Sequence, residues 1–384
     1  MLNNAKQIVD ILLNPSLLLS MPLAQQSDLM IVLRHQKIIA RFAYLTKQYD
    51  VFDKLHEKTQ RHLKNALKIA EKQKEQVQLE ASLISNLLKN ESKFVVFLKG
   101  AAYTLSDTLV GKGRVYSDID ILVNKAELKS CEQTLAFDGW LGQEISNYDD
   151  KYYRKWAHEI PPLEHCERGT IIDVHHNIIP IISQDAPTVE ALTSFIQTNK
   201  QGIQTLTPAA QFVHSAVHLF RNEDYNNAFR DISDLYLMLL NENGNEVNEN
   251  FLLDVQKVAD DLTFNYEVGL AYSLVSQIFS LNIPKNFIER NLNKSRLRTA
   301  FDQFIFKDVL LPQHDLLPGS HTPFKHFLAI IRGHFIKMPF ALLCYHLIVK
   351  LGRSIIEMIF GKHIFTPKDE MTLDNIEQNK AHKN

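Results

Sequence analysis

The stretch that decides the fold reads "KGRVYSDIDILVN" and covers residues 112–124. Side chains alternate along a strand, so Asp118 and Asp120 would share one face, whereas Ile119 and Ile121 would share the other. Two carboxylates this close raise each other's pKa and cost stability unless a cation or a shared proton neutralises them. We therefore expect a positive group beside these aspartates.

The segments around this stretch predict a small α/β unit. "FVVFL" (94–98) is a short β-rich run, and the "KGAAYTL" that follows it can open a helix at a glycine turn. Residues 125–140 have the pattern of an amphipathic helix that ends at Gly139. Two further strand candidates follow, "YYRKWAHEI" (152–160) and "GTIIDVHHNI" (169–178).

Helical patterns surround the unit on both sides. Apolar residues recur near the helical period before residue 90, and they do so again from "LTPAAQFVHSAVHLF" (206–220) onward. We expect an α+β protein in which a small mixed-sheet α/β core lies between helical parts. Its expected segments are an N-terminal helical segment (1–90), the α/β core (91–185), a helical domain (186–364) and a flexible polar tail (365–384).

Composition restricts the class of partner and the compartment. The formal net charge of -2 gives no global basic surface of the kind that duplex-binding proteins carry. The three cysteines have no metal-ligand spacing, and their odd number fits a reducing compartment. The N-terminus lacks the pattern of a signal peptide, and the uncharged apolar run at 338–349 is shorter than the roughly 20 residues of a spanning helix. We expect a cytoplasmic protein without a transmembrane span.

The C-terminal stretch 324–362 mixes basic residues with aromatic and aliphatic ones. Two interpretations are open: the stretch lies on an anionic membrane surface, or it is a buried helix pair whose basic residues face solvent or a phosphate-bearing acceptor. The basic residues are Lys325, Arg332, Lys337, Lys350, Arg353 and Lys362.

A divalent metal would balance the paired aspartates. Mg²⁺ takes carboxylate oxygens and is commonly held by one or two protein carboxylates together with substrate phosphates. A third acid, Asp173, lies among β-branched residues in "TIIDVHH". Acids on adjacent strands can hold two metals, which stabilise both the attacking and the leaving oxygen of an in-line displacement. This combination predicts phosphoryl or nucleotidyl transfer.

Three stretches carry a family resemblance: "FLKGAAYTL", "RVYSDIDILV" and "HEIPPLEHCERGTIIDVHHNI". They resemble the uncharacterised nucleotidyltransferase family, within the polymerase-beta-like superfamily, over roughly residues 90–240. The resemblance implies NTP-dependent transfer of an NMP group to an acceptor hydroxyl, with release of pyrophosphate. It also implies that Asp118 and Asp120 bind Mg²⁺ or Mn²⁺, and that Asp173 completes the catalytic metal site and helps to activate the acceptor.

The same resemblance implies a nucleotide site for ATP or another NTP. The turn at Lys99 and Gly100 would receive the triphosphate, and Arg114 and Ser117 match the family's pattern. Many relatives in the wider superfamily have serine where this chain has Ala101, so Lys99 would supply the missing phosphate contact as a point charge. The alternatives are that Lys99 is a surface lysine and that Arg114 neutralises an aspartate.

Several polar residues have competing interpretations. His175 faces the same way as Asp173, so it borders the acceptor side of the site or orients a carboxylate. His218 either contacts the acceptor or lies structurally between domains. His214 and His218 share a helix face, but no glutamate follows His214 as a zinc-protease motif requires.

The helix that carries "VHLFRNEDYNNAFRDISDLYLML" resembles the family only loosely. Its family-like polar positions are His218, Arg230 and Asp234. The four-residue spacing of Arg230 and Asp234 predicts an ion pair on one helix face.

The acceptor stays open at this stage. A sugar, another small molecule, a peptide, a protein side chain and an RNA end are all compatible with the sequence. The alternative to an enzyme is a catalytically idle protein on the same fold that senses nucleotide or docks a partner, an alternative that Ala101 and the large helical remainder support.

Overall fold

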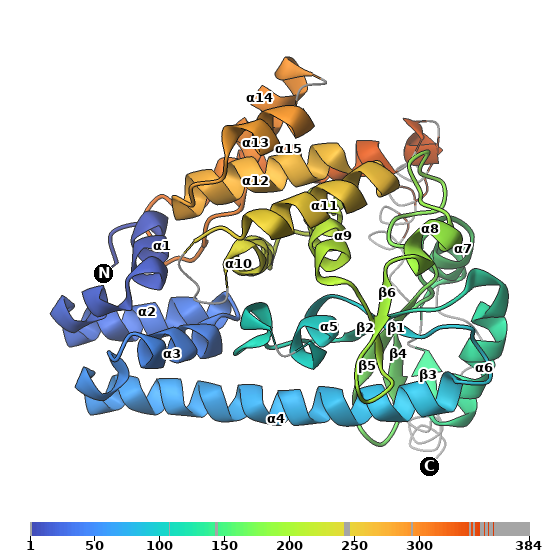
Figure 1. Ribbon diagram of the computed structural model, residues 1–384, viewed down its shortest axis with the longest axis horizontal. Coiled ribbons are helices and arrows are strands. Elements are labelled where there is room, and N and C mark those ends of the chain that lie inside the picture. The colour runs from blue at the N-terminus through green and yellow to red at the C-terminus, as the bar shows by residue number, and fades with distance from the viewer. Residues whose placement is uncertain are drawn as a thin grey trace, which may run out of the picture.

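The long helix α4 (Glu57–Leu88) is the base on which the other elements are arranged (Figure 1). The computed structural model describes residues 2–106, 108–142, 145–241, 246–292 and 295–337, with 339–340, 342–345, 349, 352 and 356. Along α4 lie first α2 (Leu23–His35) and α3 (Ile39–Gln48), then α5 (Lys99–Leu105) and α6 (Leu128–Phe137). The helix therefore connects the N-terminal helices to the sheet.

The sequence of α4 explains this role. Its buried side chains recur at helical spacing along one stripe, while Lys, Glu and Gln occupy the other faces. The apolar members of the stripe are Leu63, Ala66, Leu67, Ala70, Val77, Ala81, Ile84 and Leu88. The remaining N-terminal elements are α1 (Ala5–Leu13) and the 3-10 helices η1 (Pro15–Ser20) and η2 (Phe52–Lys54).

Within the described residues, the strands form one seven-stranded mixed sheet of order β3-β4-β5-β2-β1-β7-β6. Strand β2 pairs in parallel with β5 and antiparallel with β1, and β1 pairs in parallel with β7. The expected α+β class with a mixed sheet is therefore confirmed. The strands are β1 (Val96–Phe97), β2 (Ile119–Leu122), β3 (Trp140–Gly142), β4 (Leu163–His165), β5 (Ile171–His175), β6 (Ile196–Thr198) and β7 (Gln204–Leu206).

Two apolar cores lie on opposite faces of the sheet. One core joins Ile119 and Ile121 of β2 to Ile172 of β5 and to the C-terminal half of α4. The other core includes Leu122 and continues into the N-terminal and C-terminal helices. The polar side chains of β2 and β5 therefore point to the side where the C-terminal helices lie.

Residues 152–160, predicted above as a strand, are helical through Trp156. They belong to α7 (Asn147–Trp156), whose first turn is capped by the Ser146 side chain. Acidic residues occupy its first turn and basic residues its last, and Arg154 pairs with Asp150 at 2.8 Å one turn earlier. These helix-end effects outweigh the strand preference of the aromatic residues.

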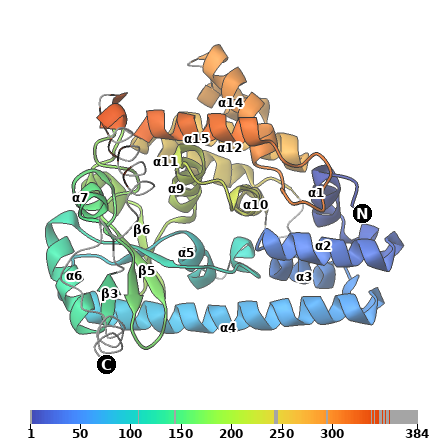
Figure 2. The same cartoon turned by 180° about the vertical axis from the view of Figure 1, so that it is seen from behind.

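The C-terminal helices lie on the opposite side of the molecule from α4 (Figure 2). Strands β6 and β7, which follow residue 185, join the same sheet as the strands before it. The 3-10 helices η3 (Leu109–Gly111) and η4 (Lys125–Glu127) lie in the loops before and after β2. The later helices are α8 (Val189–Thr193), α9 (Pro208–Arg221), α10 (Ala228–Leu239), α11 (Glu249–Leu262), α12 (Asn265–Phe279), α13 (Lys285–Leu292), α14 (Arg296–Val309) and α15 (Pro323–Lys337).

Helix α15 carries three of the six basic residues of the C-terminal stretch, and each of the three has an acidic partner. Arg332 is buried and donates to Asp302 of α14, whereas Lys325 pairs with Asp308 and Lys337 with Glu223. No helix in the described part of the chain combines the length and apolar character needed to cross a bilayer. Lys350, Arg353, Lys362 and the 365–384 tail lie outside the described residues, so the membrane contact stays a prediction.

A buried ion-pair cluster joins three distant parts of the chain. Asp234 of α10 accepts from Arg41 of α3 at 2.5 Å and from Arg114, in the loop before β2, at 2.9 Å. Gly113 allows the close approach of that loop, because its φ is +69° and an added Cβ would lie 2.5 Å from the Arg41 backbone nitrogen. Arg230 pairs instead with its neighbour Asp231 at 2.8 Å, so the i,i+4 pair with Asp234 predicted above is wrong.

Replacing Asp234 should destabilise the whole protein. Asp234→Ala would leave two buried guanidinium groups without their shared carboxylate, which we expect to cost about 3–5 kcal/mol of unfolding free energy. Asp150→Ala is the control, because Asp150 of α7 forms an exposed pair with Arg154 outside this cluster, so it should cost about 1 kcal/mol or less. Denaturant titration measures both values, and equal losses would contradict a special role for Asp234.

Candidate active site

The parallel register of β2 and β5 sets the geometry of the acidic site. Asp120 is directly paired with Asp173 in this register, so the two side chains lie next to each other on the same face of the sheet. Asp118 comes immediately before β2 and borders two cavities, one shared with Asp120 and the other with Asp173. The structure thus brings together the three acids that the sequence predicted to share a site.

Asp120 is buried, and two basic side chains compensate its charge. Lys99 Nζ donates to Asp120 Oδ1 at 2.6 Å, and His175 Nε2 lies 2.9 Å from the same oxygen. Burial alone would raise the pKa of Asp120, but Lys99 and then His175 outweigh it and hold that pKa far below its ordinary value. Burial likewise lowers the pKa of Lys99, yet Asp120 and Glu159 more than reverse this shift.

The start of α5 is strained at Lys99 rather than at Gly100. Lys99 adopts a φ of +45°, a region that costs a non-glycine residue about 1 kcal/mol or more. A Cβ added at Gly100 would only make ordinary contacts, the nearest being Tyr116 Cβ at 3.5 Å. The salt bridge to Asp120 supplies an interaction that compensates this strain, and the conformation directs the lysine into the site.

Asp173 differs from Asp120 because no basic side chain in the described residues pairs with it. Its Oδ1 atom is buried and has no hydrogen-bond partner among them. Burial, followed by the charges of Asp120 and Glu159, raises the pKa of Asp173 to about 7. Asp173 is therefore poised between its neutral and charged forms near neutral pH.

Two cavities flank the acids. One, of about 150 Å³, includes Gly100, Ser117 and Arg230 in its wall. The other, of about 260 Å³, is lined by Asp173 and by residues from α9 and α15. The residues common to both walls are Lys99, Asp118, His218 and Asn222.

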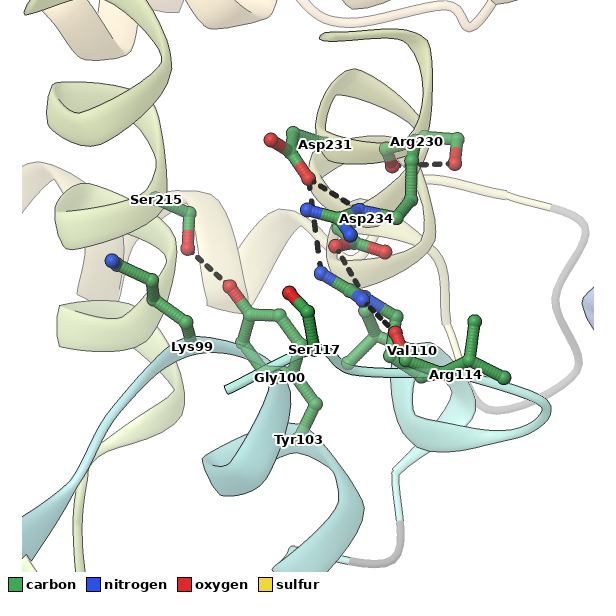
Figure 3. Close-up of polar contacts among 12 residues, drawn as sticks. Lys99, Gly100, Tyr103, Val110, Arg114, Ser117, Ser215, Arg230, Asp231 and Asp234 are labelled. Atoms are coloured by element: carbon green, nitrogen blue, oxygen red, sulfur yellow. Dashed lines mark hydrogen bonds and ion pairs between the residues drawn. The ribbon is translucent and has the colours of Figure 1, made fainter. Parts of the chain in front are cut away.

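The predicted nucleotide residues have different surroundings. Ser117 is exposed and donates to Asp118 at 2.9 Å. Arg114 borders the smaller cavity, but it is buried and points to Asp234, away from Lys99 (Figure 3). Arg114 therefore neutralises an aspartate, the alternative that the sequence left open, although this partner lies on α10 and outside the acidic site.

The predicted acceptor-side histidines also lie in this region. His175 is almost fully buried between Asp120 and Glu159, so it orients a carboxylate. His218 of α9 lines both cavities, and burial, followed by the charge of Lys99, holds its pKa well below the ordinary value. His214 is buried on the same helix and has its pKa lowered to about 3, mainly by burial. Both α9 histidines are therefore neutral at physiological pH.

Sequence patterns missed His158 and Glu159, which lie beside these groups. Glu159 Oε2 is 3.3 Å from His175 Nδ1, and His158 borders the larger cavity. An isolated antiparallel bridge pairs Glu159 with His175. Both missed residues occur in the "HEI" of the family-like stretch, which is the signal that would have singled them out.

The residues present fit a divalent metal ion. Asp118, Asp120 and Asp173 supply oxygen donors between the two cavities, the chemistry that Mg²⁺ and Mn²⁺ prefer. Their oxygens do not all lie within 4.8 Å of one another, and Asp120 Oδ1 is paired with Lys99 and His175, so binding an ion would require these side chains to move. The buried and unpartnered Oδ1 of Asp173 is the observation in favour, since such an oxygen is costly unless a cation or donor satisfies it. These three acids would be the ligands.

A family comparison agrees with this geometry. The sequence model described as "Uncharacterised nucleotidyltransferase" matches residues 22–280, which is more than half of the chain. This chain belongs to the uncharacterised nucleotidyltransferase family. The matched region includes α2 to α12. It therefore contains the sheet, all three acids and helix α9, whose His218 lines both cavities. Searches of curated proteins and of solved structures gave no match.

The state of Asp173 should make stability depend on pH in a defined direction. The pKa of the Asp173 carboxyl is 3.8 in the ordinary case and about 7 in the folded protein. Between these two pH values, the folded protein keeps a proton that the unfolded chain releases. The contribution of Asp173 to stability is thus complete below about pH 4 and is lost as the pH rises toward about 7.

Asp173→Asn cannot titrate, so in EDTA its melting temperature should increase relative to wild type as the pH rises through this window. Thermal unfolding across the pH series measures the difference. Glu164→Gln, on the exposed part of β4, is the control and should show no such trend. A difference between wild type and Asp173→Asn that is constant with pH would contradict the raised pKa.

Proposed function

We propose that this protein transfers an NMP group from an NTP, with ATP as the first candidate, to an acceptor hydroxyl, in a reaction that needs Mg²⁺ or Mn²⁺ and releases pyrophosphate. The observation that carries the proposal is the pairing of Asp120 with Asp173 in adjacent parallel strands, with Asp118 on the same wall. Membership of the nucleotidyltransferase family supports it. A cytoplasmic location, which would supply NTPs, belongs to the same proposal.

The smaller cavity is our candidate for the triphosphate. Lys99 provides a cation at its edge, and Gly100 and Ser117 lie in its wall. A divalent ion held by the three acids would stabilise charge on the phosphoryl oxygens. Arg114, being bonded to Asp234, supports this wall through the ion pair rather than by a phosphate contact of its own.

The larger cavity is our candidate for the acceptor. Asp173 lines it, and a carboxylate that holds a metal through one oxygen can accept a proton through the other. We infer that Asp173 accepts the proton of the acceptor hydroxyl as that hydroxyl attacks the phosphoryl group. His218, which lines both cavities and is neutral, is placed to bind the acceptor near the reacting groups.

Transfer should be visible as labelling of an acceptor. Incubating the purified protein with cell extract, Mg²⁺ or Mn²⁺ and each NTP labelled in the α-phosphate should label a component that mass spectrometry can identify. The double variant Asp118→Ala, Asp120→Ala should abolish the label. Persistent labelling by this variant would refute the assigned metal site.

Asp173→Asn separates chemistry from binding. The substitution keeps the size of the side chain but removes its ability to accept a proton, so turnover should be almost completely lost. NTP affinity should change by less than about tenfold, or about 1.4 kcal/mol, because Lys99 and Gly100 are unaltered. Labelling rates and NTP titrations measure the two quantities, and unimpaired turnover would remove Asp173 from the mechanism.

The alternative function is nucleotide sensing or partner docking without catalysis. The observation that favours it is the contact of Lys99 with Asp120, since a lysine amine can replace a metal as the cation in such a site. Calorimetry distinguishes the two functions. A sensor would bind NTP equally well in EDTA and after Asp120→Ala, with no turnover of any acceptor, whereas the enzyme should lose affinity in both cases.

A further inference from the structure

Three side chains beside the acids converge on one point. His158, Glu159 and His175 each direct one potential ligand atom into a group whose members all lie within 4.8 Å of one another. Glu159 and His158 border the larger cavity, and His175 is the buried member of the group. Neither His158 Nδ1 nor His175 Nδ1 has a hydrogen-bond partner among the described residues.

His175 is held in the orientation that a metal-binding histidine needs. Its Nε2 lies 2.9 Å from Asp120 Oδ1, so Asp120 fixes the ring and leaves Nδ1 directed at Glu159. Histidine ligands in metal sites characteristically have the other ring nitrogen bonded to a carboxylate in this way. The arrangement thus resembles the carboxylate–histidine–metal triads of known sites.

His175 Nδ1 lies 3.3 Å from Glu159 Oε2, and His158 Nε2 lies 4.0 Å from the same oxygen. The three side chains thus bring potential ligand atoms around one point. A metal ion would use all three donors.

We propose that His158, Glu159 and His175 form a metal site, separate from the three aspartates, that takes a nitrogen-seeking ion such as Zn²⁺. Two imidazoles and one carboxylate are a ligand set of catalytic zinc sites, which leave a coordination position open. Here the open position would face the larger cavity, where an acceptor group can enter. Mg²⁺ would instead select the oxygen-only donors of the aspartates.

Metal binding by the full chain, prepared without a histidine tag, tests this site directly. Co²⁺ replaces Zn²⁺ and reports tetrahedral coordination by its visible absorption, and Zn²⁺ affinity follows from competition with a chromophoric chelator. Wild type should bind one Co²⁺ that Zn²⁺ displaces. His158→Ala and Glu159→Gln should each weaken Zn²⁺ binding by about 100-fold or more, since they remove ligands rather than supporting groups.

Two controls make the result specific. His218→Gln changes a histidine of the same cavity outside the group, and Asp118→Asn weakens only the carboxylate site, so both should leave Zn²⁺ affinity unchanged. Melting curves in EDTA establish that each variant is folded, and Glu159→Gln keeps the shape of the native side chain. The readout does not depend on NMP transfer, so failure of the proposed enzymatic function would leave it intact.

Absence of a Co²⁺ spectrum in wild type would overturn the proposal. So would a Zn²⁺ affinity that survives the combined change His158→Ala, Glu159→Gln. Loss of Zn²⁺ binding in Asp118→Asn, with retention in His158→Ala, would assign the ion to the aspartates instead.

Discussion

The buried charge of Asp120 is the constraint around which the site is built. A carboxylate that is only 4% exposed needs compensation, and the fold provides it from two directions, with Lys99 from the strained start of α5 and His175 from β5. The parallel register then fixes Asp173 beside it, and no basic side chain of the described residues pairs with Asp173. Two neighbouring acids consequently have opposite pKa shifts, one far below and one well above the ordinary value.

Buried charges on the helices around the sheet are likewise paired with opposite charges. Asp234 holds Arg41 and Arg114 together, so the N-terminal helices, the loop before β2 and α10 are fixed to one another by a shared carboxylate. Arg332 does the same between α15 and α14 through Asp302. These buried pairs connect the helices that border the two cavities, so the geometry of the acidic site depends on residues far from it in sequence.

Local patterns predicted much of this structure. Alternation in β2, the β-branched neighbours of Asp173 and the helical stripe of α4 are properties of short segments, so they could be interpreted from sequence. The sequence allowed Arg114 to neutralise an aspartate, but the partners of Lys99 and Arg114 could not be assigned, because these ion pairs join segments brought together only by folding. The strand prediction for residues 152–160 was wrong for a different reason. Aromatic residues suggested a strand, but the cap and the charges at the helix ends favoured α7.

The most direct test of the nucleotidyltransferase assignment is a crystal structure with Mn²⁺ and a non-hydrolysable ATP analogue, in which anomalous scattering locates the metal. We predict Mn²⁺ at Asp118, Asp120 and Asp173, with the triphosphate in the smaller cavity and Lys99 Nζ moved from Asp120 to a phosphate oxygen. A nucleotide bound elsewhere, or one bound with Lys99 still paired to Asp120 and no metal at the three acids, would contradict the account.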